Sequence, residues 1–400
     1  MRKTLLDLAK LVLPQTAAKQ RLLVLAWPHV TAEQLKQLEY YLKMDKLFGI
    51  EHDFGTTAAI GAKGAWVEFK THVGDGPLRA FCLEVSNEIK SAVDEESFQE
   101  FSGRAGTVFP SMVANNIVGM EREKLLAALL LFAKEPFHIL LLGDPGTGKT
   151  EILRSISALG RTGSFGLGSG TSAAGLGAAI VGGEVVKGLL PLADGGIACI
   201  DELNLMTGKD QAALYNAMEK GFVTIDKGGK HEQLAAHVRV IATANPTGDK
   251  FIGQGVAVLK KQLPFPDALL SRFHMILIVR RPDAEELGEI TRKIIAQEKQ
   301  ASAGADLEYL KAYQEWSWGR EVALRAEHED LIARFIKALA EDEEKFLVDI
   351  GPRTAVGTIR LAKAYARMHG KTKVEKQDLV RVLELVKDVL YVRKQERPEG

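Results

Sequence analysis

The 400-residue sequence is poor in cysteine, with only Cys82 and Cys199. These two lie far apart and in no C-x-x-C pair, so we expect neither a disulfide framework nor a structural zinc site. Long apolar runs are also missing, since the longest, at 125–133, is shorter than the ~20 residues that cross a bilayer. The opening MRKTLLDLAKLVLP is interrupted by Asp7 and Lys10, and no cleavage site follows it. We therefore expect a cytoplasmic protein that has no contact with membranes.

An excess of either charge is absent as well. Lys plus Arg and Asp plus Glu both number 52, so a basic binding site must be local if there is one. Hydrophobic residues make up 46% of the chain and charged residues 26%, which is the balance of a globular protein. The length suffices for two or three domains with substantial cores.

The first hundred residues differ in pattern from the rest. VTAEQLKQLEYYLK (30–43) predicts a helix, and AWVEFKTHVGDGPLRAFCLEV (65–85) predicts two strands around a Gly-Asp-Gly-Pro turn. We expect residues 1–105 to form a small α+β domain, whose role the residues do not indicate. The acidic stretch 91–101 is expected to be a solvated connector.

From about residue 108, short apolar strands alternate with helices. Four strands are predicted, within 138–153, 195–204, 238–246 and 273–279. Continuous apolar strands separated by helices predict a parallel sheet covered by helices on both faces, so we expect an α/β core over 106–281. Residues 282–400 are expected to form an α-helical lid, in which Thr372 begins the last helix through a capping box with Glu375.

A complete phosphate-binding motif follows the first of these strands. GDPGTGKT matches G-x-x-x-x-G-K-[ST] and lies between a predicted strand and a predicted helix. In such a loop the backbone N–H groups surround the β-phosphate, Lys149 reaches the β- and γ-phosphates, and Thr150 holds Mg²⁺. The residues expected to bind the nucleotide here are Gly143, Asp144, Pro145, Gly146, Thr147, Gly148, Lys149 and Thr150.

Polar side chains end two of the other strands. Asp201 and Glu202 close an apolar strand, which puts two carboxylates at the edge of the sheet where ligands of such folds bind. Asp201 is expected to bind ATP and its Mg²⁺, and Glu202 to orient or deprotonate the attacking water. Asn245, at the end of IATAN, is expected to help place that water. Together with Lys149, these residues predict an ATP hydrolase.

Six segments in fixed order resemble the ATPase region of the minichromosome maintenance (MCM) replicative helicases, a family of AAA+ ATPases. They are the phosphate loop, LADGGIACIDELNLM, ALYNAMEKGFVTIDKGGK, IATANPTGDKF, LPFPDALLSRFHMIL and GPRTAVGTIRLAKAYARMHG. The resemblance runs from about Phe109 to about Leu390. It implies an AAA+ core with a helix-2 insert, matched here by the glycine-rich stretch 163–188, whose glycines favour mobility. It also implies a homo-hexameric ring that moves along DNA.

Two arginines acquire roles through this resemblance. Arg272, in Ser-Arg-Phe, matches the arginine finger that reaches into the site of the neighbouring subunit. A fixed guanidinium there stabilises the charge that spreads over the γ-phosphoryl oxygens. Arg353, in Gly-Pro-Arg, matches the sensor-2 position at the start of a lid helix, which is thought to act across the interface as well.

The stretch VTIDKGGK predicts a β-hairpin before Asn245. FVTI, DKGGK and AAHVRVIAT are expected to form strand, turn and strand, with Gly-Gly supplying the turn. By the resemblance, Lys227 matches a lysine at the hairpin tip that faces the ring channel, and Lys230 is a weaker second candidate. A lysine on a stiff hairpin contacts backbone phosphates without reading sequence, so single-stranded DNA is the expected ligand.

Several residues depart from the family pattern. Asn204 stands where the family has Asp, and His274 replaces an Asp; we expect His274 to be structural. The amino-terminal part is short and poor in cysteine, so we expect a short, divergent member without the usual zinc module. As a DNA-bound protein it would be associated with the nucleoid if its source is prokaryotic, with replication proteins as partners.

Two other functions stay open at this point. One is a protein-remodelling chaperone of the MoxR or chelatase-like AAA+ groups, which share both insertions. The other is a non-motor MCM paralogue that assembles with a full helicase. DNA-dependent ATP turnover distinguishes the motor from both.

Overall fold

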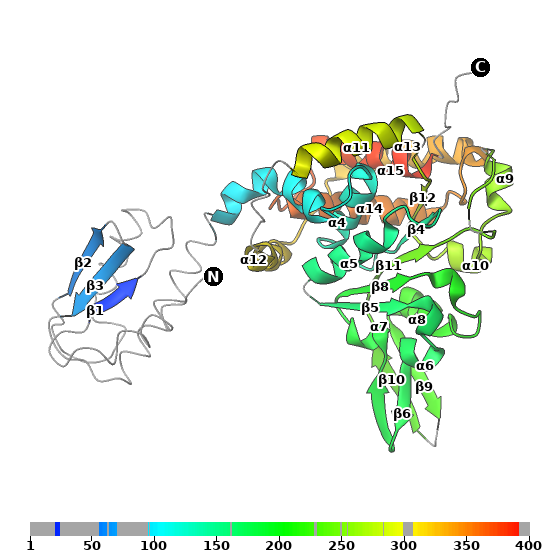
Figure 1. The fold of residues 1–400 in the computed structure, drawn as a ribbon, viewed down its shortest axis with the longest axis horizontal. Helices are drawn as coiled ribbons and strands as arrows, with labels where there is room; N and C mark the ends of the chain where they lie inside the picture. Colours follow the sequence, from blue (N-terminus) through cyan, green and yellow to red (C-terminus); the bar gives the residue numbers. More distant parts are fainter. Residues whose placement is uncertain are drawn as a thin grey trace. The chain divides into compact units, whose positions relative to one another are not determined.

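A computed structural model of the chain has two compact units, Met1–Glu100 and Phe101–Gly400 (Figure 1). It describes residues 21–24, 56–61, 64–69, 95, 97–160, 162–227, 230–248, 250–253, 255–282, 284–298 and 307–391. The second unit contains both the expected α/β core and the expected lid. The domain limits at 105 and 281 remain a prediction.

The described part of the first unit is an antiparallel sheet of three strands. They are β1 (Arg21–Val24), β2 (Thr56–Gly61) and β3 (Gly64–Phe69), in the order β1-β3-β2. β2 and β3 form a hairpin in which Gly61 pairs with Gly64. The predicted strand at the start of 65–85 is therefore present as β3. The predicted helix 30–43, the turn and the second strand lie outside the described residues.

The second unit is built on a parallel sheet of five strands in the order β12-β4-β11-β8-β5. The strands are β4 (Ile139–Gly143), β5 (Gly163–Leu167), β8 (Ile197–Asp201), β11 (Arg239–Ala244) and β12 (Met275–Val279). β4, β8 and β11 are buried along their whole length, as their apolar sequences predict. The parallel α/β core is thus confirmed. Four of its strands were predicted; the edge strand β5 was not.

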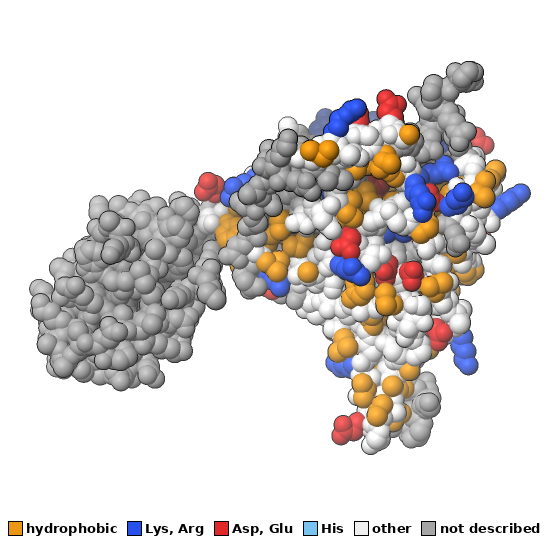
Figure 2. All heavy atoms as spheres, viewed as in Figure 1, with side chains coloured by type: hydrophobic (Ala, Val, Ile, Leu, Met, Phe, Trp, Pro, Cys, Tyr) orange, Lys and Arg blue, Asp and Glu red, His pale blue; other side chains and the backbone are white. Residues whose placement is uncertain are grey.

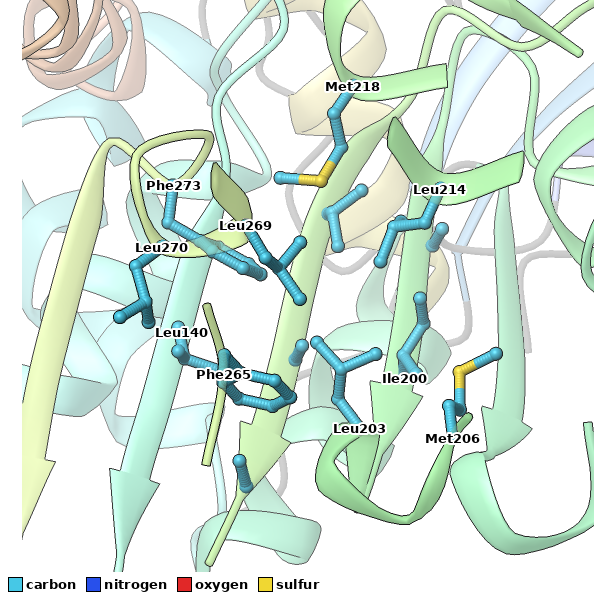
Figure 3. Close-up of a cluster of buried hydrophobic side chains, with 14 of the residues drawn as sticks. Leu140, Ile200, Leu203, Met206, Leu214, Met218, Phe265, Leu269, Leu270 and Phe273 are labelled. Carbon is cyan, nitrogen blue, oxygen red and sulfur yellow. The ribbon is translucent and has the colours of Figure 1, made fainter. Parts of the chain in front are cut away.

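Helices cover both faces of this sheet. On one face, Leu140 and Ile200 pack against Leu214 and Met218 of α8 (Ala212–Lys220) and Leu269 of α10 (Asp267–Leu270) (Figure 3). The opposite face is covered by α5 (Lys149–Leu159), which contacts β5, β8 and β11. Since alternate residues of a strand point to opposite faces, each buried strand supplies both cores.

Two hairpins extend from the core and lie side by side at the lower end of Figure 1. The first belongs to the insert between β5 and β8, which contains α6 (Ala173–Leu176), β6 (Ala178–Val181), β7 (Glu184–Lys187) and α7 (Leu189–Leu192). The expected insert at 163–188 is wrong at its start, because 163–167 is a strand of the main sheet. The glycines at 182–183 form the turn of a paired hairpin.

The second hairpin is the one predicted before Asn245. It consists of β9 (Phe222–Lys227) and β10 (Lys230–Ala235). Its return strand is KHEQLA, whereas most of the expected return strand AAHVRVIAT, residues 239–243, belongs to β11. The hairpin thus ends earlier in the sequence than predicted and is separate from the main sheet.

The region after Arg281 is helical, as predicted. Its helices are α11 (Ala284–Glu298), α12 (Leu307–Trp318), α13 (Glu329–Glu341), α14 (Pro352–Met368) and α15 (Lys376–Leu390). The prediction that Thr372 begins the last helix is wrong. Glu375 is the cap of α15, because it and Asp378 exchange hydrogen bonds with each other's backbone N–H groups.

The expected solvated connector also needs correction. Residues 97–112 are helical, and Phe101, the last residue of the stretch, is only 4% exposed. Its ring lies 4.7 Å from that of Tyr313 and 6.2 Å from that of Phe109, centroid to centroid. This aromatic cluster buries one side of the helix, so the segment packs against the rest of the unit despite its acidic composition.

The surface agrees with the balanced composition. On the face drawn in Figure 2, the described acidic and basic side chains are interspersed and form no single charged patch. No described helix combines the length and apolarity needed to cross a membrane.

Candidate active site

The phosphate loop connects β4 to α5, as its motif requires. Gly146 and Gly148 have φ of 74° and 89°, values that favour glycine. A Cβ at Gly148 would also lie 2.4 Å from Cδ1 of Ile117. The loop delivers its last residues to the amino end of α5, where backbone N–H groups and the helix dipole favour a phosphate.

Lys149 lies at the base of this loop and is 6% exposed. Its Nζ donates hydrogen bonds to the carbonyls of Gly143 and Asp144, each 2.7 Å away. Burial lowers the pKa of Lys149 to about 8, against the opposing effect of nearby carboxylates, Asp144 first among them. A buried ammonium of this kind gains from an added anion, so the site fits a phosphate.

Asp144 holds the loop in place. Its carboxylate accepts hydrogen bonds from the backbone N–H of Phe251, at 2.8 Å, and of Arg281, at 3.1 Å. Its own N–H donates to the carbonyl of Val279. These three groups are engaged within the chain, so Asp144 ties the loop to the segments after β11 and β12. The predicted contact of Asp144 with the nucleotide remains a prediction.

Thr150 and Asp201 lie together, as the sequence predicts for a magnesium site. Oγ1 of Thr150 is 3.2 Å from Oδ1 of Asp201, which is 4% exposed. Hydroxyl and carboxylate oxygens are ligands that Mg²⁺ prefers, and Mg²⁺ commonly uses one or two protein ligands together with phosphates and water. No group of three His, Cys, Asp or Glu residues that could hold a metal occurs in the described part of the chain. The hydroxyl of Thr150 and the carboxylate of Asp201 fit a Mg²⁺ ion bound together with nucleotide phosphates, and these two residues would hold it.

Thr243 of β11 connects the two acidic residues, and the sequence analysis missed it. Its Oγ1 donates to Oδ1 of Asp201 at 2.5 Å and accepts from the N–H of Glu202 at 2.9 Å. A polar residue among the buried apolar residues Val240, Ile241, Ala242 and Ala244 was the available signal.

Glu202 has a strained backbone. Its φ of 53° and ψ of 45° lie in the left-handed region, which costs a non-glycine residue about 1–3 kcal/mol. Strain of this kind persists only where neighbours hold it, and here Thr243 holds the N–H while Leu205 donates to the carbonyl. Glu202 is partly exposed, as its predicted role in positioning water requires.

Asn245 lies at the same edge of the sheet, directly after β11. Its backbone N–H donates to Oδ1 of Asn204 at 3.0 Å. Asn204, noted only as a departure from the family pattern, thus fixes the chain that carries Asn245. The structure brings Lys149, Asp201 and Asn245 to one edge, because each follows or ends one of three adjacent parallel strands.

Arg272 lies beyond the other end of the sheet. β12 pairs with β4 from Met275 beside Ile139 to Val279 beside Gly143, a span of about 13 Å. Arg272 precedes this span and the phosphate loop follows it. The guanidinium of Arg272 donates from Nη2 to Oε2 of Glu219 at 2.8 Å and lies 4.8 Å from the ring of Tyr215. It is therefore separated from the phosphate loop of its own chain.

Arg353 lies beside Arg272 and not beside Lys149. Arg353 is in the first turn of α14, and its Nη1 donates to the carbonyl of Ser271, the neighbour of Arg272. Both arginines predicted to act across an interface thus lie on one edge of the chain.

His274 is structural, as expected. It is 8% exposed, stacks on Phe137 at 5.2 Å, and its Nδ1 accepts the N–H of His138 at 3.0 Å. Burial lowers its pKa to about 2, and the Arg360 guanidinium, 3.1 Å from Nε2, acts in the same direction. The ring lies between the backbone N–H of His138, just before β4, and Arg360 of α14.

The two candidate DNA-binding lysines lie at the tip of the second hairpin. Lys227 is the last residue of β9, Lys230 is the first of β10, and the two are paired in register. Their side chains are outside the described part of the structure. Their role remains a prediction.

Comparison with known proteins identifies relatives. Residues 103–298 match the MCM P-loop domain, which implies nucleotide binding. The chain is 32% identical over 303 residues to "Minichromosome maintenance protein MCM" of Saccharolobus solfataricus, covering 69% of this chain and 43% of that protein. It is 33% identical over 270 residues to "DNA replication licensing factor MCM4" of Arabidopsis thaliana, covering 62% and 31%. It is 28% identical over 336 residues to "DNA replication licensing factor mcm7-B" of Xenopus laevis, covering 77% of this chain and 45% of that protein. The chain spans less than half the length of these relatives.

Proposed function

The chain belongs to the minichromosome maintenance family, and on that premise we propose that it is an AAA+ ATP hydrolase that couples hydrolysis in a hexameric ring to translocation on, or unwinding of, DNA. Two of its relatives are named DNA replication licensing factors, which supports a role of this kind.

The observation that carries the proposal is the separation of Arg272 from Lys149. The residues expected to bind nucleotide lie at one end of the sheet, and Arg272 and Arg353 lie together beyond the other end. A heterologous, head-to-tail contact between copies joins such unlike surfaces, and rotation that closes produces a ring. Arg272 of one copy then completes the site of the next. Hydrolysis consequently requires an oligomer.

Within each site, the residues have separate tasks. The loop 143–150 and Lys149 bind the phosphates of ATP, and Thr150 and Asp201 hold Mg²⁺, which neutralises charge on the phosphates. Glu202 orients or deprotonates the attacking water, and Asn245 helps to place it.

We propose that the ring moves along DNA. β9 follows α8 directly, and α8 carries Glu219, the partner of Arg272. A change at Arg272 is thereby transmitted along one short helix to the hairpin that ends in Lys227. Lysine binds phosphate as a point charge without base recognition, which suits a motor that must pass every sequence.

The test is ATP turnover with and without single-stranded DNA. We expect DNA to stimulate the parent protein, and Lys227→Ala to remove the stimulation while leaving basal turnover unchanged. Lys376→Ala, which changes an exposed lysine on α15, is the matched control and should behave as the parent does. If DNA has no effect on the parent, the motor proposal is wrong, and a protein-remodelling chaperone or a non-motor paralogue becomes the better account.

A further inference from the structure

The end of strand β5 packs against the backbone of Glu202. Leu167 pairs in register with Asp201, so the next residues on each strand, Gly168 and Glu202, come side by side. A Cβ at Gly168 would lie 2.2 Å from the carbonyl oxygen of Glu202 and 2.8 Å from its carbonyl carbon. Because the obstacle is backbone, a side chain at Gly168 would displace Glu202.

The other side of Glu202 is occupied as well. Oγ1 of Thr243 accepts its N–H at 2.9 Å, and the N–H of Leu205 donates to its carbonyl at 2.9 Å. The peptide of Glu202 is thus held between β11 and the end of β5, in a left-handed conformation that depends on such support. Gly168 is the part of this support that comes from the insert.

The insert is anchored to the same segment at a second point. Oδ1 of Asp210 accepts the N–H of Ala173, the first residue of α6, at 2.8 Å. Asp210 follows Glu202 by eight residues and precedes α8. The insert therefore contacts the 202–210 segment at both Gly168 and Ala173, while its hairpin lies beside β9.

We propose that Gly168 is a positioning residue for Glu202, through which the position of the insert is transmitted to the catalytic carboxylate. This inference rests on the proposed function, since Glu202 acts there in ATP hydrolysis. Glycine is required at 168 by the close approach of the Glu202 carbonyl, and its own φ is outside the left-handed range. An insert displaced by a bound ligand would alter the placement of Glu202, and so the rate of hydrolysis.

The chain offers a matched pair of variants to test this. Gly168→Ala introduces the clash with Glu202, whereas Gly170→Ala adds the same methyl group two residues later, where no described atom lies within 4 Å. We expect Gly168→Ala to lower kcat at least about tenfold, because small displacements of reacting groups have effects of this size. KM and the affinity for ADP should change less than about twofold. Gly170→Ala should match the parent.

Hydrogen exchange provides a readout that does not depend on activity. Displacement of the Glu202 carbonyl breaks its hydrogen bond with the N–H of Leu205, so amide exchange in 202–206 should accelerate at least about tenfold in Gly168→Ala and not in Gly170→Ala. If Gly168→Ala does not fold, Thr171→Val is the substitute. It deletes the 2.6 Å hydrogen bond from Oγ1 to the Leu167 carbonyl that closes the turn around Gly168, and smaller changes of the same sign are expected.

The outcomes separate the two proposals. A parent protein without ATP turnover contradicts the proposed function. Amide hydrogen exchange in 202–206 would still test the contact between Gly168 and Glu202 in that case. An active parent with unchanged kcat and unchanged exchange in folded Gly168→Ala overturns the role of Gly168 and leaves the proposed function standing.

Discussion

Thr243 donates a hydrogen bond to Asp201 across two adjacent parallel strands, with 2.5 Å between Oγ1 and Oδ1. The same oxygen accepts the N–H of Glu202. One hydroxyl thus orients the predicted magnesium ligand and the predicted catalytic residue at once.

We expect Thr243→Val to be destabilised by about 1–3 kcal/mol, because the N–H of Glu202 loses its acceptor in a region shielded from water. The same change should lower kcat while the affinity for ADP stays near that of the parent. Thr243→Ser keeps the oxygen and should retain most of the rate. Chemical denaturation and steady-state kinetics on the three proteins measure both effects. Equal rates for Thr243→Val and Thr243→Ser would show that the hydroxyl has no part in orienting Glu202.

Nucleotide affinity should depend on pH through Lys149. Burial lowers the pKa of this lysine to about 8 in the free protein, and bound phosphates raise it, so binding takes up a proton where the free lysine is neutral. Affinity should be constant below about pH 7 and fall by up to about tenfold per unit above pH 8. Titration with a fluorescent ADP analogue between pH 6.5 and 9.5 measures this. A flat profile to pH 9.5 would show that Lys149 stays charged in the free protein.

Two buried histidines should make the fold sensitive to acid. Burial lowers the pKa of His138 to about 3 and that of His274 to about 2, below the ordinary value of 6.5 expected in the unfolded chain. Protons therefore bind the unfolded chain first, and stability is lost as the pH falls from about 6.5 toward 3. At pH 5 the loss is about 2 kcal/mol for each histidine.

Denaturation curves at pH 7 and pH 5 test this expectation. His274→Gln should be less stable than the parent at pH 7 but should lose less stability between the two values. An identical slope in His274→Gln would contradict the burial of a neutral ring.

Much of the fold could be predicted because its signals are local. Apolar strands that end in Gly143 and Asp201, or just before Asn245, indicate a parallel sheet with polar groups at one edge, and that edge is present. The strand β5 could not be predicted in the same way. Its sequence GSFGL has two glycines and alternating exposure at the sheet edge, and only pairing with β8 makes it a strand.

The missed site residues share a different cause. Thr243 and Asn204 act through contacts with residues about 40 positions away, and such contacts depend on which strands are neighbours. The close approach of Gly168 to Glu202 likewise follows from strand order. Residues whose role is to hold others become visible only in three dimensions.

The claim on which the account depends is that ATP is hydrolysed at a seam between copies, with Lys149 from one and Arg272 from the next. Lys149→Ala and Arg272→Ala should each be inactive alone, and Arg272→Ala should still bind ADP. When the two variants are mixed in equal amounts under conditions of subunit exchange, up to about a quarter of the parent turnover should return. About one interface in four then combines the intact Lys149 of an Arg272→Ala copy with the intact Arg272 of a Lys149→Ala copy. Turnover that stays at zero in the mixture, or a fully active Arg272→Ala protein, would contradict the shared site.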